Sequence, residues 1–188
     1  MSPFEYVAVL VSIILGLGIT QIITGLADAL HQKNVRFYWP HVLWVLLVFI
    51  LHVHEWWIFY EMRTNTSWQL GQFLFTLLYP INLFVLARLL FPINWAEGYN
   101  LKAFYLQHFR KLYWGFISLA ALSIVTNLAI LGDPLLEQVN KLFILVLLLP
   151  TVLRQSVPER VHQIIVSVLF VLMLVSQVFT WNELVIEA

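Results

Sequence analysis

Six long apolar segments, separated by short polar stretches, dominate this chain. An α-helix needs about 20 apolar residues to cross the hydrocarbon layer of a bilayer, and all the segments but a marginal fifth one meet that length. The segments cover about residues 4–30, 38–61, 68–91, 111–132, 135–153 and 159–182. The pattern predicts an all-α integral membrane bundle of six transmembrane helices, with residues 1–188 forming a single domain.

The longest polar stretch, about residues 94–110, carries a helical pattern of its own. Apolar residues recur in it at helical spacing with basic residues among them: Leu101, Phe104, Tyr105 and Phe109, with Lys102 and Arg110. Such a pattern is typical of a helix that lies in the membrane interface. We therefore expect a short interfacial helix between the third and fourth spans.

Composition supports the membrane class and removes several kinds of chemistry. The chain is 61% hydrophobic and 11% charged, whereas soluble domains carry about 25% charged residues. It has no cysteine, which excludes disulfides, thiolate metal sites and cysteine nucleophiles. Its basic residues are too few and too scattered for nucleic acid, so the lipid bilayer is the expected partner.

The basic residues predict the orientation of the helices. If the six segments span the membrane, eight of the ten Lys and Arg residues fall on one side: Lys33, Arg36, Arg88, Lys102, Arg110, Lys111, Arg154 and Arg160. Only Arg63 and Lys141 fall on the other. Cytoplasmic loops are enriched in Lys and Arg, so both termini are expected outside, in what we take to be a bacterial inner membrane.

Polar residues within the spans form two predicted layers, of which the outer one is the main candidate site. Glu55 and Lys141 both lie roughly 9 Å below the outer boundary, given a rise of about 1.5 Å per residue. The layer contains Glu55, His52, Lys141, Asn127 and Gln177. These residues could line a polar cavity open to the outside, with Glu55 paired to Lys141. Alternatively, Lys141 extends to the interface and Glu55 lies one turn from water.

Glu55 is the predicted centre of this layer. Burial disfavours the charged form of its carboxyl group, whereas a nearby ammonium favours that form. A carboxyl group balanced between these effects, one turn from His52, could exchange protons near neutral pH.

The second layer lies near the cytoplasmic boundary. It contains Asp28, Arg88, His41, His162, Asn82 and Gln21. Asp28 and Arg88 could form an ion pair that holds the first span against the third. The alternative is ordinary interfacial charge near the lipid headgroups.

The histidines leave open the possibility that the protein binds a metal or a haem. His52 and His54 point about 200° apart on a helix, so they cannot chelate one metal together. His54-Glu55 begins a near match to the zincin motif HExxH that fails at its last position. His41 and His162 are the only pair suited to a haem, whereas hydrogen bonding within the bundle explains all of these histidines without a cofactor.

No catalytic motif is present, and three functions stay open. The first is transport or sensing of a small solute or ion through the outer polar cavity. The second is a metal- or haem-binding redox enzyme or subunit. The third is a structural or assembly role, with the glycine face of the first span (Gly16, Gly18, Gly25) contacting another membrane protein. The small size of the chain favours a homo-oligomer or a complex with a membrane-protein partner.

Overall fold

The computed structural model describes residues 3–64, 69–132 and 134–186. Its long helices are α1 (Pro3–His31), α2 (Trp39–Phe59), α3 (Leu70–Leu89), α4 (Leu101–Thr126), α5 (Val139–Leu153) and α6 (Glu159–Ile186). Short helical turns follow α2 (Tyr60–Thr64), follow α4 (Asn127–Leu131, a π-helical turn) and precede α5 (Leu135–Gln138). No strand occurs in the described residues. Six segments are long and apolar enough to cross a membrane, which confirms the predicted helical membrane class.

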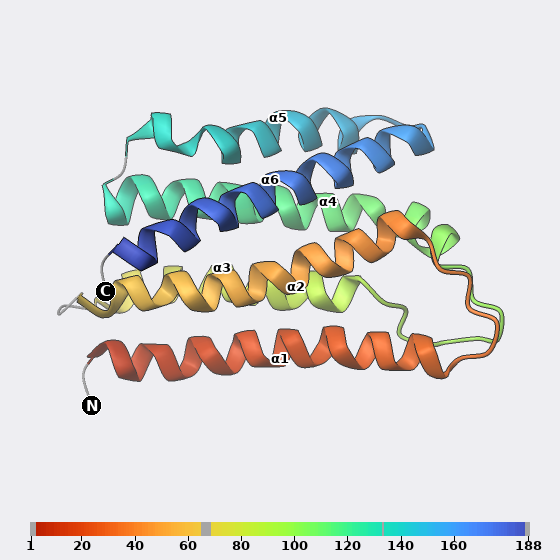
Figure 1. Ribbon diagram of the computed structural model, residues 1–188, viewed down its shortest axis with the longest axis horizontal. Coiled ribbons are helices and arrows are strands. Elements are labelled where there is room, and N and C mark those ends of the chain that lie inside the picture. Colours follow the sequence, from red (N-terminus) through yellow and green to blue (C-terminus); the bar gives the residue numbers. More distant parts are fainter. Residues whose placement is uncertain (1–2, 65–68, 133, 187–188) are drawn as a thin grey trace.

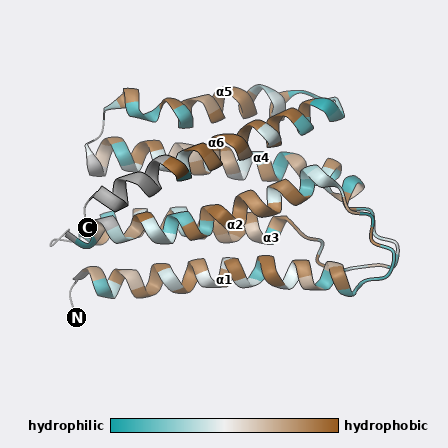
Figure 2. Ribbon diagram, viewed as in Figure 1, coloured by the Kyte–Doolittle hydropathy of each residue, from teal (hydrophilic) through white to brown (hydrophobic). Residues whose placement is uncertain are grey.

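The helices form an up-and-down bundle (Figure 1). α1 packs on α2 and α3, α4 packs between α3 and α5, and α6 packs on α2 and α5. Both termini lie at one end of the bundle, which we call the terminal end. The loops 32–38, 90–100 and 154–158 lie at the other end, here called the basic end, and apolar residues cover most of the length between the two (Figure 2).

The separate interfacial helix is not found in residues 94–110, all of which the structure describes. Instead α4 begins at Leu101 and runs without a break to Thr126. The side chain of Asn100 caps its first turn by accepting hydrogen bonds from the backbone N–H groups of Lys102 and Ala103, at 3.0 and 3.2 Å. Leu101, Phe104 and Tyr105, the residues expected at the lipid interface, are buried within the bundle.

Three sets of contacts tie the basic end together. Arg36 pairs with Asn100 across two loops, through hydrogen bonds of Arg36 N to Tyr99 O at 2.9 Å and of Leu101 N to Arg36 O at 3.1 Å. Arg110 donates to the carbonyl oxygens of Arg154 and Gln155 at 2.6 and 3.2 Å. Lys102 forms an ion pair of 2.6 Å with Glu159. Both side chains of this pair are exposed, so water screens the attraction and the pair adds little to the stability of the bundle.

Glycines bring neighbouring helices into close contact. A Cβ atom at Gly18 would overlap the ring of His52 on α2, and one at Gly25 would overlap the ring of Phe91, just beyond α3. Gly16 differs, because no described residue of another element lies within 4 Å of the position its Cβ would take. Two of the three glycines of α1 are therefore used inside this bundle, against α2 and the end of α3.

Candidate functional site

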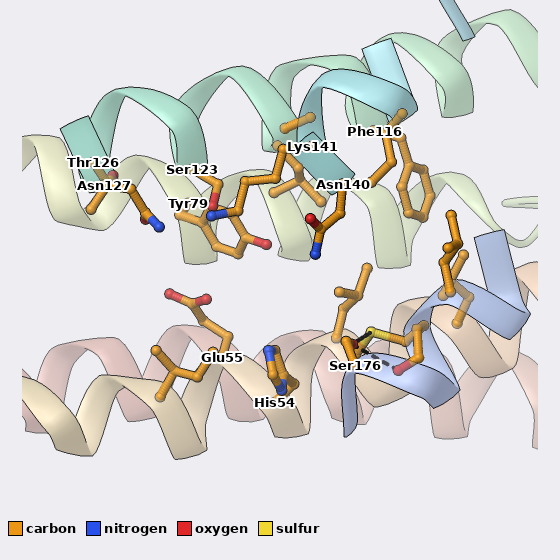
Figure 3. A pocket seen from close by; sticks show the side chains of 18 of the residues that line it. His54, Glu55, Tyr79, Phe116, Ser123, Thr126, Asn127, Asn140, Lys141 and Ser176 are labelled. Carbon is orange, nitrogen blue, oxygen red and sulfur yellow. Dashed lines mark hydrogen bonds between the residues drawn. The ribbon is translucent and has the colours of Figure 1, made fainter. Parts of the chain in front are cut away.

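A cavity of about 430 Å³ lies among α2, α3, α4, α5 and α6 (Figure 3). Its size falls in the range of about 300–1,000 Å³ that is usual for small-molecule sites. Glu55 and His54 reach it from α2, and Lys141 and Asn140 reach it from α5 on the facing wall. Asn127 completes the set of predicted residues that line it, from the π-helical turn after α4.

The lining of the cavity changes along the bundle: polar and apolar side chains are mixed toward the terminal end, and apolar side chains line the part near the middle. Along α4 and into the π-helical turn that follows it, the lining runs from Phe116 to Asn127, which is about 16 Å along a helix. The deep part is lined by apolar side chains that include Leu47, Phe116 and Leu169. The charged and amide groups lie nearer the terminal end. The cavity therefore has charged and amide groups at one end and an apolar lining at the other.

Glu55 and Lys141 face the cavity but do not form the predicted ion pair. In the described part of the chain, no hydrogen bond or ion pair is made by Glu55, whose side chain is half-buried. The ammonium of Lys141 donates instead to Oε1 of Gln138, at 2.6 Å, one turn back on its own chain segment. Opposite charges therefore extend into one cavity from facing walls without direct contact with each other (Figure 3).

His52 lies outside the cavity, in the contact between α1 and α2. It is fully buried, and its Nδ1–H donates to the carbonyl oxygen of Val48 at 2.7 Å. Its Nε2 atom lies against Gly18 and has no hydrogen-bond partner among the residues that the structure describes. The residue that does accompany Glu55 is His54, whose Nδ1 accepts a hydrogen bond of 2.7 Å from Gln177 on α6. Gln177 thus holds a wall residue in place but does not itself line the cavity.

Several lining residues were missed by the sequence analysis: Thr76, Tyr79, Ser123, Thr126, Asn140 and Ser176. Ser123 could have been found, because it lies four residues before Asn127 and so on the same helix face. Tyr79 and Ser176 carried no such signal, since only the packing of α3 and α6 brings them to the cavity.

The inner layer contains a buried hydrogen-bonded cluster, here called the inner cluster: Trp44, Tyr105, Tyr113 and His162. Trp44 Nε1–H donates to the Tyr105 hydroxyl at 3.2 Å, and the two tyrosine hydroxyls are 3.1 Å apart. Nδ1 of His162 lies 2.9 Å from the Tyr113 hydroxyl and 3.3 Å from that of Tyr105. The Trp44 ring packs against Phe116, with centroids 4.7 Å apart, and Phe116 lines the cavity. The inner cluster therefore forms the floor beneath the cavity.

The other inner-layer residues have separate roles. His41 donates from Nε2 to the carbonyl oxygen of Leu90 at 2.6 Å. Asn82 donates to the carbonyl oxygen of Gly115 at 3.2 Å and to the Ser118 hydroxyl, which ties α3 to α4. Gln21 is half-buried on α1.

Asp28 and Arg88 do not form the expected ion pair within the described residues, and both side chains are exposed. α1 and α3 do pack together. Their contact next to Asp28 comes from Gly25 and the Phe91 ring, so apolar packing takes the place of the predicted charge pair.

The histidines also differ from the arrangement expected for a haem pair. His41 packs against the rings of Phe91 and Phe104, while His162 packs against Tyr105, Phe109 and Tyr113. Among the residues that the structure describes, no three His, Asp or Glu side chains are grouped as a metal site would require.

The six long apolar helices of the described residues define the class: the chain is a multi-pass integral membrane protein. Comparison with known proteins adds no family to this, since no protein family, curated protein or solved structure matches the sequence.

Proposed function

We propose that this protein binds a small solute in the cavity and transports or senses it. The observation that carries the proposal is a carboxylate and an ammonium facing one cavity from different helices. Ionisable side chains at membrane depth are costly and are concentrated in solute and ion pathways. The two charged side chains do not pair with each other, and both line the same cavity.

We infer that the cavity opens toward the outside of a bacterial inner membrane. The loops at the basic end carry Lys33, Arg36 and Arg154, and cytoplasmic loops are enriched in such residues. The terminal end, where the polar part of the cavity lies, would then be external. This orientation supports uptake or detection of an external solute.

Cysteine labelling tests the orientation and the access route together. Because the chain contains no cysteine, single cysteines can be introduced without a background. A membrane-impermeant maleimide added to intact cells should label Ser123→Cys in the cavity. It should label Ser156→Cys, in the loop at the basic end, only after the membrane is permeabilised. The reverse pattern would show that the orientation is wrong.

A solute panel tests the function. The purified protein in lipid nanodiscs is titrated with amino acids, sugars, amines, carboxylic acids and inorganic ions, and binding is measured by calorimetry. At least one class should bind, and Glu55→Gln should weaken it about tenfold, because a charged hydrogen bond is lost. Glu97→Gln, an exposed change in the loop 90–100, is the matched control.

Uptake into proteoliposomes then separates the two forms of the proposal. Accumulation of the bound solute indicates transport, and binding without flux indicates sensing. If no class binds, or if Glu55→Gln and the wild type bind equally, the cavity is not the functional site.

A further inference from the structure

Glu55 is the group that decides the charge of a ligand in this cavity. It reaches the cavity from α2, its side chain is half-buried, and within the described residues it makes no hydrogen bond or ion pair (Figure 3). A carboxylate at membrane depth is costly unless an opposite charge or hydrogen-bond donors compensate it. A ligand with a positively charged N–H donor supplies both, and it favours the ionised form of the carboxyl group.

Lys141 does not supply this compensation by direct contact. It lies on the facing wall, and its ammonium donates to Oε1 of Gln138, at 2.6 Å, rather than to Glu55. Its positive charge repels a cation from across the cavity. Because Coulomb energy falls with distance, an ammonium group in contact with Glu55 gains more than it loses to Lys141. The carboxylate therefore determines the sign of the ligand, and Lys141 lowers the affinity without reversing that preference.

Below the level of Glu55 the cavity favours an apolar group. Leu47 and Glu55 lie about two helical turns apart on α2, which is about 12 Å along the axis. Phe116 on α4 and Leu169 on α6 line the same deep part. Transfer of an apolar group from water into such a lining is favourable. The depth leaves room for an apolar body several carbon atoms long beneath a charged end group.

We propose that the cavity binds a primary amine that carries an apolar body, with its ammonium group on the Glu55 carboxylate and its body toward Phe116. This assignment rests on the proposed function, since it names the class of solute for the same site. The charge on Glu55 disfavours carboxylic acids and other anions, which would place a second negative charge beside it.

Three probes with the same six-carbon skeleton test the charge. Hexylamine, 1-hexanol and hexanoate differ in whether the end group is cationic, neutral or anionic. Binding of each probe to the full-length protein in nanodiscs is measured by calorimetry, with empty nanodiscs as the blank for partition into lipid. Hexylamine should bind about tenfold more tightly than 1-hexanol, because a charged hydrogen bond replaces a neutral one. Hexanoate should bind most weakly of the three.

Chain length tests the apolar body. Butylamine has the same end group as hexylamine and two fewer methylene groups. Each buried methylene group contributes about fourfold in affinity, so butylamine should bind about tenfold more weakly than hexylamine. Equal binding of the two amines would show that the ligand does not reach the deep lining, which overturns the apolar part of the proposal.

Two cavity variants with effects of opposite sign assign the contact. Glu55→Gln should abolish the preference for hexylamine over 1-hexanol. Lys141→Met removes a positive charge from the facing wall, so it should tighten the binding of hexylamine several-fold. Lys111→Met and Glu97→Gln make the same chemical changes at exposed positions outside the cavity, so they should keep the wild-type affinities. Thermal unfolding of every variant confirms that it is folded.

The proposal is overturned if 1-hexanol or hexanoate binds the wild-type protein as tightly as hexylamine, or if folded Glu55→Gln keeps the preference for the amine. Weaker binding of hexylamine to folded Lys141→Met also overturns it, since Lys141 would then contact the ligand favourably. If none of these probes binds the wild-type protein, the amine is rejected as the ligand, whereas the proposed function then depends on the remaining classes of the solute panel.

Discussion

Replacing Gly18 with alanine should destabilise the bundle by about 1–3 kcal/mol, the usual cost of overpacking a filled core. The new Cβ atom would overlap the His52 ring. That ring is fully buried and bonded to the Val48 carbonyl oxygen, so it has no open space into which to move. We therefore expect α1 and α2 to be forced apart, which thermal unfolding monitored by circular dichroism in detergent should detect.

Gly16→Ala is the control for this substitution. It makes the same chemical change on the same helix, but its added Cβ meets no neighbouring side chain in the described part of the chain. Since alanine favours helix more than glycine does, the stability should be unchanged or slightly raised. Equal melting temperatures for the two variants would contradict the close packing of α1 on α2.

Replacing His162 with leucine should cost about 1–3 kcal/mol, because it leaves a buried hydroxyl without an acceptor. The inner cluster has three donors: the Trp44 N–H and the hydroxyls of Tyr105 and Tyr113. These can be satisfied in a chain in which Trp44 donates to Tyr105, Tyr105 to Tyr113, and Tyr113 to Nδ1 of His162. Without the imidazole, one O–H at the end of the chain has no partner. The change is measured by the same thermal unfolding.

Tyr113→Phe provides the contrast. It removes one donor and one acceptor together, and the Tyr105 hydroxyl already lies 3.3 Å from Nδ1 of His162, where it can donate directly. The loss of stability should therefore be clearly smaller than for His162→Leu. A larger loss for Tyr113→Phe would show that the hydrogen bonds do not run toward His162.

The helices were predictable from the sequence because length and apolar content alone decide whether a segment can cross a bilayer. The error at residues 94–110 has a physical cause. Amphipathic spacing is the same for a helix on the membrane surface and for the first turns of a helix that packs in a bundle, so it cannot separate the two. The capping side chain of Asn100 was the local signal that α4 begins at Leu101.

The candidate site was only partly predictable. Depth along a helix placed Glu55, Asn127 and Lys141 at one level, and all three do line the cavity. The direction in which each side chain points around its helix axis was less predictable, because depth does not tell where the neighbouring helices lie. His52 and His54 flank Glu55 on its two sides, and only the positions of α1 and α6 decide that His54 is the one beside the cavity.

The contacts between polar side chains could not be predicted from the sequence. Lys141 bonds to Gln138 within its own segment, although Glu55 lies across the cavity. Opposite charge and equal depth therefore bring two groups to the same space without bringing them into contact.

The floor formed by the inner cluster has a consequence for the path of a solute. If the proposed opening at the terminal end is right, a molecule that enters there would meet Phe116 and then the Trp44 ring packed beneath it, so the cavity would have one opening in this conformation. Nearer the basic end, the helices are held together by the hydrogen bond of Arg110 to the Arg154 carbonyl oxygen and by the ion pair of Lys102 with Glu159. A receptor can function with such a cavity, since its ligand can bind and leave through the same opening. A transporter would need a second conformation in which Trp44 moves out of the path and the Arg110 and Lys102 contacts are broken.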